Sequence, residues 1–313
     1  MSGGAVDHLR DSLERVLTLI QDSELVPYDK ANTNLNIGQN FSQSTSLLDK
    51  CKSVEKKYEN KKPVLRIIHH FACSGGTLIS QCISAMPNIY LLSEIHPYTN
   101  LHLGGVKAKY LPSDIISLSK YANIPNFGQL ADQIFISNIT KANDHVRQYA
   151  GELILRDHTH SDFCVGSTTS NKPALFSLLE SHFQIKNIVT IRNPVDSYLS
   201  LVNNNWRHFT PSSFDEYCKR FIEMTTCYKE CDIYRYEDFV KEPTVIMQKM
   251  CESLDLAYSN CFIDIFELFK VTGGSGRKSS VISEMPQRKI SSVFLEEVKE
   301  STNFKLIAKT FNY

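Results

Sequence analysis

The chain has 313 residues, of which 42% are hydrophobic and 22% are charged, and its 34 lysines and arginines balance 34 aspartates and glutamates. This composition is typical of a globular protein and excludes a mainly disordered or collagen-like chain. A net charge of zero gives no reason to expect a nucleic-acid partner or a polybasic membrane tether. No stretch of ~18 apolar residues is present, so no membrane span is expected. The sequence does not indicate an oligomeric state.

The nine cysteines contain no CxxC pair and are spaced irregularly, which argues against a zinc site or a disulfide framework. We expect reduced, mostly buried thiols. Because the first residues contain no apolar signal core, we expect a cytoplasmic protein.

The first sixty residues differ in character from the rest of the chain. Five apolar residues recur there at the spacing of one helix face, namely Leu9, Leu13, Val16, Leu17 and Ile20. Residues 28–48 are rich in Asn, Ser, Thr and Gln. We therefore expect an N-terminal helix and a polar linker over residues 1–60, and the main domain over residues 61–313.

From residue 64 onward, short apolar runs alternate with segments of helical spacing. Strands are predicted over residues 64–71, 89–92, 152–155, 187–191 and 232–237. Helices are predicted over residues 78–86, 171–182, 214–228 and 245–254 and from Pro194 onward. This alternation predicts an α/β fold with a mainly parallel sheet that helices cover on both faces. Ligands of such sheets bind at the carboxyl ends of the strands, where the polar motifs of this chain fall.

The first polar motif, Ala72-Cys73-Ser74-Gly75-Gly76-Thr77, lies between a predicted strand and a predicted helix. Glycines allow backbone N–H groups to close around an anion, and the helix N-terminus adds a partial positive charge. The hydroxyls of Ser74 and Thr77 are further donors. The motif is not GxxxxGK[ST], which disfavours an ATPase of the Walker type. A glycine-rich turn that binds no ligand is the alternative for this segment alone.

Two further motifs carry cations. Arg192 follows a predicted strand in Arg-Asn-Pro-Val-Asp-Ser-Tyr-Leu-Ser, and Ser200 lies about two turns into the next helix. An arginine and a hydroxyl placed in this way can hold a phosphate, whereas an ion pair between Arg192 and Asp196 is the alternative. Arg277 and Lys278 end a glycine-rich segment, for which a surface loop is the alternative.

Together these motifs resemble those of the sulfotransferase superfamily, whose members have a P-loop-kinase-like α/β fold. Residues 72–77 stand where the family has PKSGTT or PRSGTT, and residues 192–200 match its RNPxDxxxS signature outright. Tyr236-Glu237-Asp238 resembles a family segment whose tyrosine lies near the adenine. Gly274–Lys278 resembles the family's loop over the 3′-phosphate. The resemblance extends from about Val64 to the mid-280s.

This resemblance implies that the protein binds 3′-phosphoadenosine 5′-phosphosulfate (PAPS) as its co-substrate, without a metal. The implied nucleotide-binding residues are Cys73, Ser74, Gly75, Gly76, Thr77, Arg192, Ser200, Tyr236, Arg277 and Lys278. The chain departs from the family at Cys73, where the family has a lysine or arginine that contacts the transferred sulfuryl group. The loss of such a cation can cost several kcal/mol of transition-state stabilisation. Arg156 is the expected substitute because it ends a neighbouring strand, and His69 and His70 are weaker candidates.

Two residues compete for the role of catalytic base. Glu94 has the same spacing from the glycine motif as the catalytic glutamate of tyrosylprotein sulfotransferases, which favours it. Arg156-Asp157-His158 instead resembles the Lys-Thr-His of cytosolic sulfotransferases, whose histidine is the base. Asp157 and His160 flank His158 and are expected to orient it. A helix cap or ion pair is the structural alternative for Glu94, and a packed core or loop residue is the alternative for His158.

The resemblance predicts a sulfotransferase that moves a sulfuryl group from PAPS to a hydroxyl or amine, with a carbohydrate or small metabolite as the expected acceptor. A non-catalytic protein that binds PAPS or adenosine bisphosphate, and that lost transfer when residue 73 became cysteine, is the alternative. A small-molecule kinase on the same fold would require ATP and Mg²⁺, and the missing Walker lysine disfavours it.

Overall fold

The computed structural model describes residues 52, 61–99, 114–272, 281–284 and 290–313, and Lys62–Tyr313 form one compact unit. The helix and linker predicted over residues 1–60 lie almost entirely outside the described residues, as do Arg277 and Lys278. The domain boundary near residue 61 therefore stays a prediction.

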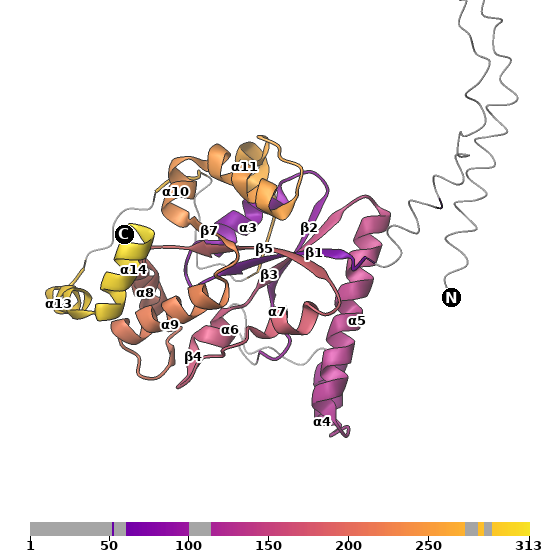
Figure 1. Cartoon of the computed structure of the whole chain (residues 1–313), viewed down its shortest axis with the longest axis horizontal. Helices are drawn as coiled ribbons and strands as arrows, with labels where there is room; N and C mark the ends of the chain where they lie inside the picture. The colour runs from indigo at the N-terminus through magenta and orange to yellow at the C-terminus, as the bar shows by residue number, and fades with distance from the viewer. Residues whose placement is uncertain (1–51, 53–60, 100–113, 273–280, 285–289) are drawn as a thin grey trace, which may run out of the picture. The chain divides into compact units, whose positions relative to one another are not determined.

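Five parallel strands form the central sheet in the order β2-β3-β1-β5-β7 (Figure 1). In that order they are Ile89–Ile95, Glu152–Asp157, Val64–His70, Gln184–Ile191 and Asp232–Arg235. The register places Ile68 of β1 opposite Arg156 of β3 on one side and Ile188 of β5 on the other. Because the strands all run in one direction, their carboxyl ends form one edge of the sheet. The predicted α/β fold with a parallel sheet is confirmed.

Helices cover both faces of this sheet (Figure 1). One face packs against α3 (Gly76–Ser84), α10 (Tyr236–Lys241), α11 (Pro243–Leu254), α12 (Phe262–Ile265) and the 3-10 helix η3 (Phe266–Leu268). The other face packs against α5 (Phe127–Gln148), α7 (Ala174–Leu179) and α9 (Phe214–Cys227). The remaining described elements are α4 (Ile115–Tyr121), α6 (His160–Phe163), α8 (Pro194–Asn203), α13 (Ser292–Glu300), α14 (Thr302–Phe311) and the paired short strands β4 (Val165–Gly166) and β6 (His208–Phe209).

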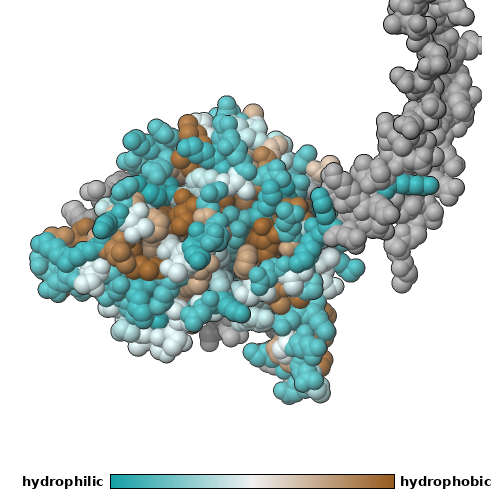
Figure 2. Space-filling model, viewed as in Figure 1, coloured by the Kyte–Doolittle hydropathy of each residue, from teal (hydrophilic) through white to brown (hydrophobic). Residues whose placement is uncertain are grey.

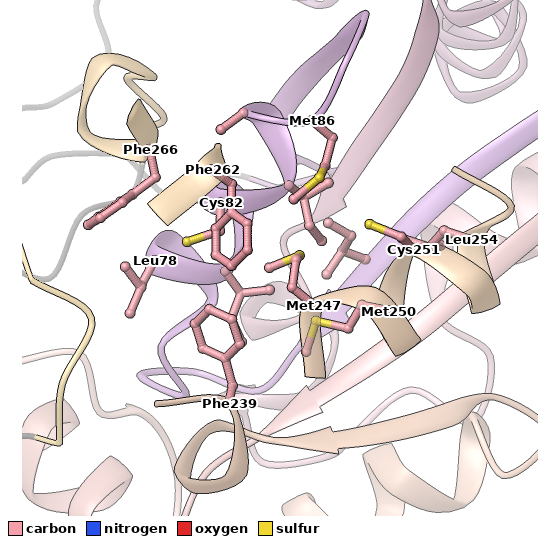
Figure 3. Packing of buried hydrophobic residues seen from close by; sticks show 14 of the residues in the cluster. Leu78, Cys82, Met86, Phe239, Met247, Met250, Cys251, Leu254, Phe262 and Phe266 are labelled. Atoms are coloured by element: carbon pink, nitrogen blue, oxygen red, sulfur yellow. The ribbon is translucent and has the colours of Figure 1, made fainter. Parts of the chain in front are cut away.

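Apolar side chains at helical spacing form the core on the α3 face, as Figure 3 shows. Leu78, Cys82 and Met86 of the α3 segment are buried there against Met247 and Met250 of α11. Complete burial of one such side chain stabilises the fold by roughly 1.5–3 kcal/mol. This apolar spacing is the pattern that predicted a helix over residues 78–86, and the helix begins two residues earlier because Gly75 serves as its N-cap.

Some predicted boundaries are wrong. The strand predicted over residues 232–237 ends at Arg235, because Tyr236 begins α10 and the acidic Glu237 lies in the favourable first turn of that helix. The helix predicted over residues 171–182 spans only Ala174–Leu179, and it begins at Ala174 because Pro173 has a non-helical backbone conformation at the N-cap. The second strand continues beyond Leu92 through an irregularity in its pairing with β3.

The face of the molecule seen in Figure 2 is mostly hydrophilic, with smaller apolar areas between the polar ones. Within the described ranges, no helix has both the length and the apolarity to cross a membrane. None of the cysteines that the structure describes forms a disulfide.

Candidate active site

The first two polar motifs lie at the carboxyl edge of the sheet, and the third, with Arg277 and Lys278, lies outside the described residues. Glu94 and Arg156 lie near the ends of β2 and β3, and the glycine turn, Arg192 and Tyr236 follow β1, β5 and β7. Five segments that are distant in the sequence therefore reach one edge of the fold.

Two aromatic rings lie directly against the glycine turn between β1 and α3. A Cβ atom on Gly75 would be 2.2 Å from Cδ2 of Tyr236, and the φ of Gly75 is +83°. A Cβ atom on Gly76 would be 2.6 Å from Cδ2 of His70. Because glycine alone combines a positive φ with the absence of a side chain at low cost, the turn requires glycine at position 75.

The amino end of α3 has the properties of an anion site. Its first turn contains no acidic residue, and among the described residues no side chain caps it at Gly75. The first N–H groups of a helix lack intrahelical acceptors, and that end carries a partial positive charge. Ser74 is only 1% exposed, and its Oγ has no hydrogen-bonding partner among the residues that the structure describes. An anionic oxygen at this position would satisfy the buried hydroxyl, so these residues fit the 5′ end of the expected nucleotide.

Arg192 is joined to the glycine turn through Tyr236. The Cζ atom of Arg192 is 4.9 Å from the centroid of the Tyr236 ring, the same ring that lies against Gly75. The ion pair to Asp196 exists, but its Nη2–Oδ2 distance of 3.6 Å is longer than that of a charge-assisted hydrogen bond. The contacts therefore argue against the alternative in which Arg192 serves only as the ion-pair partner of Asp196.

A hydrogen bond joins Glu237, which follows Tyr236, to Asn193, which follows Arg192. Oε1 of Glu237 accepts a hydrogen bond from the backbone N–H of Asn193 at 2.8 Å. The side chain of Asn193 caps α8, as its sequence predicted, and Ser200 is buried on that helix. The start of α10 thus holds the start of the helix that carries Ser200.

A buried carboxylate, Glu94, lies near the end of β2. The Glu94 Oε1 atom is 2.7 Å from Nη2 of Arg156 and 3.9 Å from Nε2 of His70, and Oε2 is 3.4 Å from Nδ1 of His158. The φ of Glu94 is +59°, a conformation that is uncommon outside glycine, and it falls at the pairing irregularity of β2. Such strain persists only where the surroundings enforce it, and it is frequent at functional sites.

Burial controls the protonation of this group of residues. It raises the pKa of Glu94 to about 7, although the nearby charge of Arg156 acts in the opposite direction. Burial, together with the charges of His96 and Arg156, lowers the pKa of His158 to about 4, and burial lowers the pKa of His70 well below its usual value. At neutral pH the two histidines are therefore uncharged, whereas Glu94 gains and loses a proton readily, as a general base requires.

The guanidinium of Arg156 contacts several groups at once. Nη1 donates to Oγ of Ser93 at 3.0 Å and to the carbonyl of Thr272 at 2.9 Å. Nη2 lies 3.1 Å from Nε2 of His70, in addition to its contact with Glu94. Since the His70 ring lies against the glycine turn, the expected substitute cation is one side chain away from the first turn of α3.

Cys73 and His69 do not join this group. Cys73 packs against the apolar cluster on the α9 face. Nδ1 of His69 is 2.7 Å from Oδ2 of Asp157, and the His69 ring stacks on Tyr228 with 3.9 Å between the ring centroids. The pairing with Asp157 removes His69 from the candidates for the substitute cation.

His158 is not oriented as the sequence suggested. Oδ2 of Asp157 accepts from His69 and from the hydroxyl of Tyr228, and Nε2 of His160 lies 3.0 Å from Nδ1 of His208. In the part of the chain that the structure describes, no hydrogen bond joins His158 to either Asp157 or His160. Asp157 therefore bonds to His69 and Tyr228, and His160 lies against His208, so neither side chain orients His158.

Ser93 and Thr272 belong to the site although the sequence did not indicate their role. Thr272 Oγ1 donates to the carbonyl of Ser93 at 3.1 Å, and Ser93 Oγ donates to the carbonyl of Thr272 at 3.2 Å. Both also accept from Arg156. No local pattern connects residues so far apart in the chain, so only the folded structure reveals this pairing.

Two negative findings complete the description of the site. Across the described residues, no three His, Cys, Asp or Glu side chains are placed to hold a metal ion. A cavity of about 370 Å³ lies beside the first half of β5, where Ile185 and Asn187 line it, and none of the candidate site residues contributes to its wall.

Fold and site together define an α/β protein with a glycine turn at the amino end of a helix and a buried carboxylate–arginine pair at one sheet edge. No family model and no curated protein matches the chain. Solved sulfotransferase domains are similar to it in fold. One, from the curacin biosynthetic pathway, is 14% identical with a TM-score of 0.47 and covers 81% of this chain and 99% of its own. Another, from the Synechococcus PCC 7002 olefin synthase, is 16% identical with a TM-score of 0.45 and covers 82% and 97%.

A third similar structure is the mouse sulfotransferase SULT7A1 complexed with PAP, at 13% identity and a TM-score of 0.36, covering 65% of this chain and 63% of that chain. With TM-scores below 0.5 and identities of 13–16%, these likenesses carry no conclusion about the activity of this chain.

Proposed function

We propose that the protein is a sulfotransferase that uses PAPS and transfers its sulfuryl group to a hydroxyl or amine of a carbohydrate or small-molecule acceptor. The observation that carries the proposal is the position of Tyr236, whose ring contacts both Gly75 and Arg192. The ring places a turn suited to bind an anion and an arginine close to each other. This arrangement suits a nucleotide that has anionic groups at both its 5′ and 3′ positions.

In this proposal the two ends of the nucleotide are held by different segments. The first-turn N–H groups of α3 and the hydroxyl of Ser74 bind the 5′-phosphosulfate. Arg192 and Ser200 bind the 3′-phosphate, with Arg277 and Lys278 as further ligands from the segment outside the described residues. Because ATP lacks a 3′-phosphate, these residues would distinguish PAPS from ATP.

When PAPS is bound, it supplies the sulfuryl group, and the protein supplies the base. Glu94 accepts the proton of the acceptor, because its pKa of about 7 lies close to the ambient pH. His158 is the weaker base, since its pKa of about 4 makes its neutral imidazole a poor proton acceptor near neutral pH. Arg156 stabilises the ionised form of Glu94 at 2.7 Å and is connected to the glycine turn through His70.

A second function is favoured by a specific observation. Cys73 supplies no charge, and Arg156 is already hydrogen-bonded to Ser93, to the Thr272 carbonyl and to Glu94. An arginine held in this way has fewer donors for a sulfuryl group. The alternative is therefore a protein that binds PAPS or adenosine 3′,5′-bisphosphate without transferring sulfate.

Thermal unfolding of the full chain separates these possibilities when it is measured with adenosine 3′,5′-bisphosphate, with ATP and without ligand. We expect the bisphosphate to raise the unfolding temperature and ATP to leave it unchanged. Transfer of ³⁵S from labelled PAPS to a panel of sugars, phenols and amines then tests catalysis. Stabilisation by ATP alone would contradict both functions, and bisphosphate binding without transfer to any acceptor would favour the non-catalytic one.

A further inference from the structure

We propose that Tyr313 is a positioning residue for Arg192 and Ser200, the proposed ligands of the 3′-phosphate. It thereby sets the preference of the site for a nucleotide with a 3′-phosphate. This inference rests on the proposed function. It comes from a chain of contacts that leads from Tyr313 through Glu237 to Asn193, the residue that follows Arg192.

Glu237 uses its two carboxylate oxygens for two different segments. Oε2 accepts a hydrogen bond from the hydroxyl of Tyr313 at 3.2 Å, and Oε1 accepts the backbone N–H of Asn193 at 2.8 Å. The Cζ atom of Arg235 lies 4.6 Å from the centroid of the Tyr313 ring. The phenol is therefore held on its face by a cation and at its hydroxyl by the carboxylate.

The environment of Tyr313 keeps its hydroxyl protonated. Burial and the negative charge of Glu237 both raise the pKa of the phenol above its usual value. The hydroxyl is therefore a donor throughout the neutral range, and the bond to a charged acceptor is stronger than one between neutral groups.

The helix that precedes Tyr313 is itself anchored. Ser301 Oγ and Asn303 Nδ2 donate to the two carboxylate oxygens of Asp215 on α9, at 2.6 Å and 2.8 Å. The backbone N–H of Tyr313 donates to the carbonyl of Ala308 at 3.1 Å. The Tyr313 hydroxyl therefore contacts Glu237 from the end of an anchored helix.

The loss of the phenol hydroxyl would release one oxygen of Glu237 and allow the carboxylate to rotate away from Asn193. Asn193 caps α8, which carries Ser200, and it is bonded directly to Arg192 in the chain. Both proposed ligands of the 3′-phosphate would then be held less firmly. The Tyr313 hydroxyl bonds to Glu237 and its ring lies on Arg235, so its loss acts on the ligands of the 3′-phosphate, and we expect binding of the 5′ group to stay unchanged.

The test compares two ligands that differ only in the 3′-phosphate, adenosine 3′,5′-bisphosphate and adenosine 5′-phosphate, by calorimetric titration of the full chain. In Tyr313→Phe we expect the ratio of the two affinities to fall about threefold to tenfold, with the affinity for adenosine 5′-phosphate unchanged. Glu237→Ala should lower the ratio at least as much. Tyr258→Phe is the matched control, because it removes a phenol hydroxyl that bonds to Asn260 and should leave the ratio unchanged.

The outcomes distinguish this inference from the proposed function. A wild-type protein that binds both nucleotides equally contradicts the proposed function itself. If the wild type prefers the bisphosphate and Tyr313→Phe keeps the full preference, the positioning role is wrong. A Tyr313→Phe variant that loses the same factor for both ligands also overturns it, because a purely structural role would weaken the two alike. Should that variant fail to fold, the ratio in Glu237→Ala decides.

Discussion

The ring of Tyr236 lies so close to Gly75 that a Cβ on residue 75 would be 2.2 Å from Cδ2 of that ring. Gly75→Ala should therefore destabilise the fold by at least ~1 kcal/mol from its positive φ, with the steric conflict added. It should also abolish stabilisation by adenosine 3′,5′-bisphosphate. Urea unfolding measures the first effect and thermal unfolding the second. Gly128→Ala is the control, since a Cβ there meets nothing within 4 Å and this variant should not be destabilised, whereas wild-type stability in Gly75→Ala would contradict the close contact.

Arg192→Ala should weaken the binding of adenosine 3′,5′-bisphosphate. Hydrogen bonds to charged groups contribute about 1.5–3 kcal/mol, so we expect a loss of roughly 10- to 100-fold in affinity. Calorimetric titration measures this loss directly. Arg147→Ala removes an exposed arginine from α5 and should have no effect. An Arg192→Ala variant with the affinity of the wild type would show that Arg192 is not a ligand of the nucleotide.

Glu94→Gln should lower the rate of sulfate transfer by about 10²–10⁴-fold, the contribution of a general base, while the affinity for the bisphosphate remains unchanged. The pH dependence of the wild-type rate should rise with a midpoint near the pKa of Glu94, about 7, because only the ionised carboxylate accepts a proton. His158→Gln should reduce the rate much less. The reverse order of the two variants would make His158 the base.

Arg156→Met removes the positive charge 2.7 Å from the Glu94 carboxylate. That charge favours the ionised carboxylate, so its loss should raise the pKa of Glu94 further and move the pH dependence of the rate toward alkaline pH. Arg156→Lys keeps the charge and should shift the midpoint less. A displacement toward acidic pH in Arg156→Met would rule out this electrostatic role.

The buried histidines should make the fold sensitive to acid. The pKa of His158 falls from 6.5 in the unfolded chain to about 4 in the folded protein, and that of His70 is also lowered, so their contribution to stability is lost as the pH falls below about 6.5. Glu94 acts in the opposite direction, because its raised pKa stabilises the fold below about 4.5 and this contribution is lost as the pH rises through about 7.

Each of these groups changes stability by at most about 1.4 kcal/mol per pH unit, so two histidines outweigh one glutamate between about pH 6.5 and 4.5. Urea unfolding at these pH values should show the free energy of unfolding decreasing as the pH falls. His158→Gln should flatten this dependence, whereas His145→Gln, on the exposed end of α5, should not. Identical slopes for wild type and His158→Gln would contradict the burial of an uncharged imidazole.

Local chemistry explains which parts of the site were predictable. The turn at residues 72–77 and the Asn193 cap were predictable because a few neighbouring residues determine them. Arg156 was predicted from its position at a strand end, and Glu94 from its spacing relative to the glycine motif. Their contact with each other depends on β2 and β3 lying side by side, which apolar patterns alone do not specify.

Other features depend on contacts between distant segments. Tyr236 was predicted in a strand but begins a helix, since its ring packs against Gly75 across the sheet edge. The pairing of Ser93 with Thr272, and of Glu237 with Tyr313, joins residues that no motif links. Such contacts follow from the tertiary fold, and a single sequence contains no periodic signal for them.

The central position of β1 has a consequence for biosynthesis. Ile68 pairs with Arg156 on one side and Ile188 on the other, so β1, the first strand among the described residues, acquires its neighbours only after two much later stretches of chain have been synthesised. Until β3 and β5 have been synthesised, the apolar side chains of β1 stay exposed and its backbone groups stay unpaired. Such a state is prone to aggregation. We therefore expect slow refolding from denaturant, dominated by non-local contacts, and insoluble products from chains that stop before residue 191.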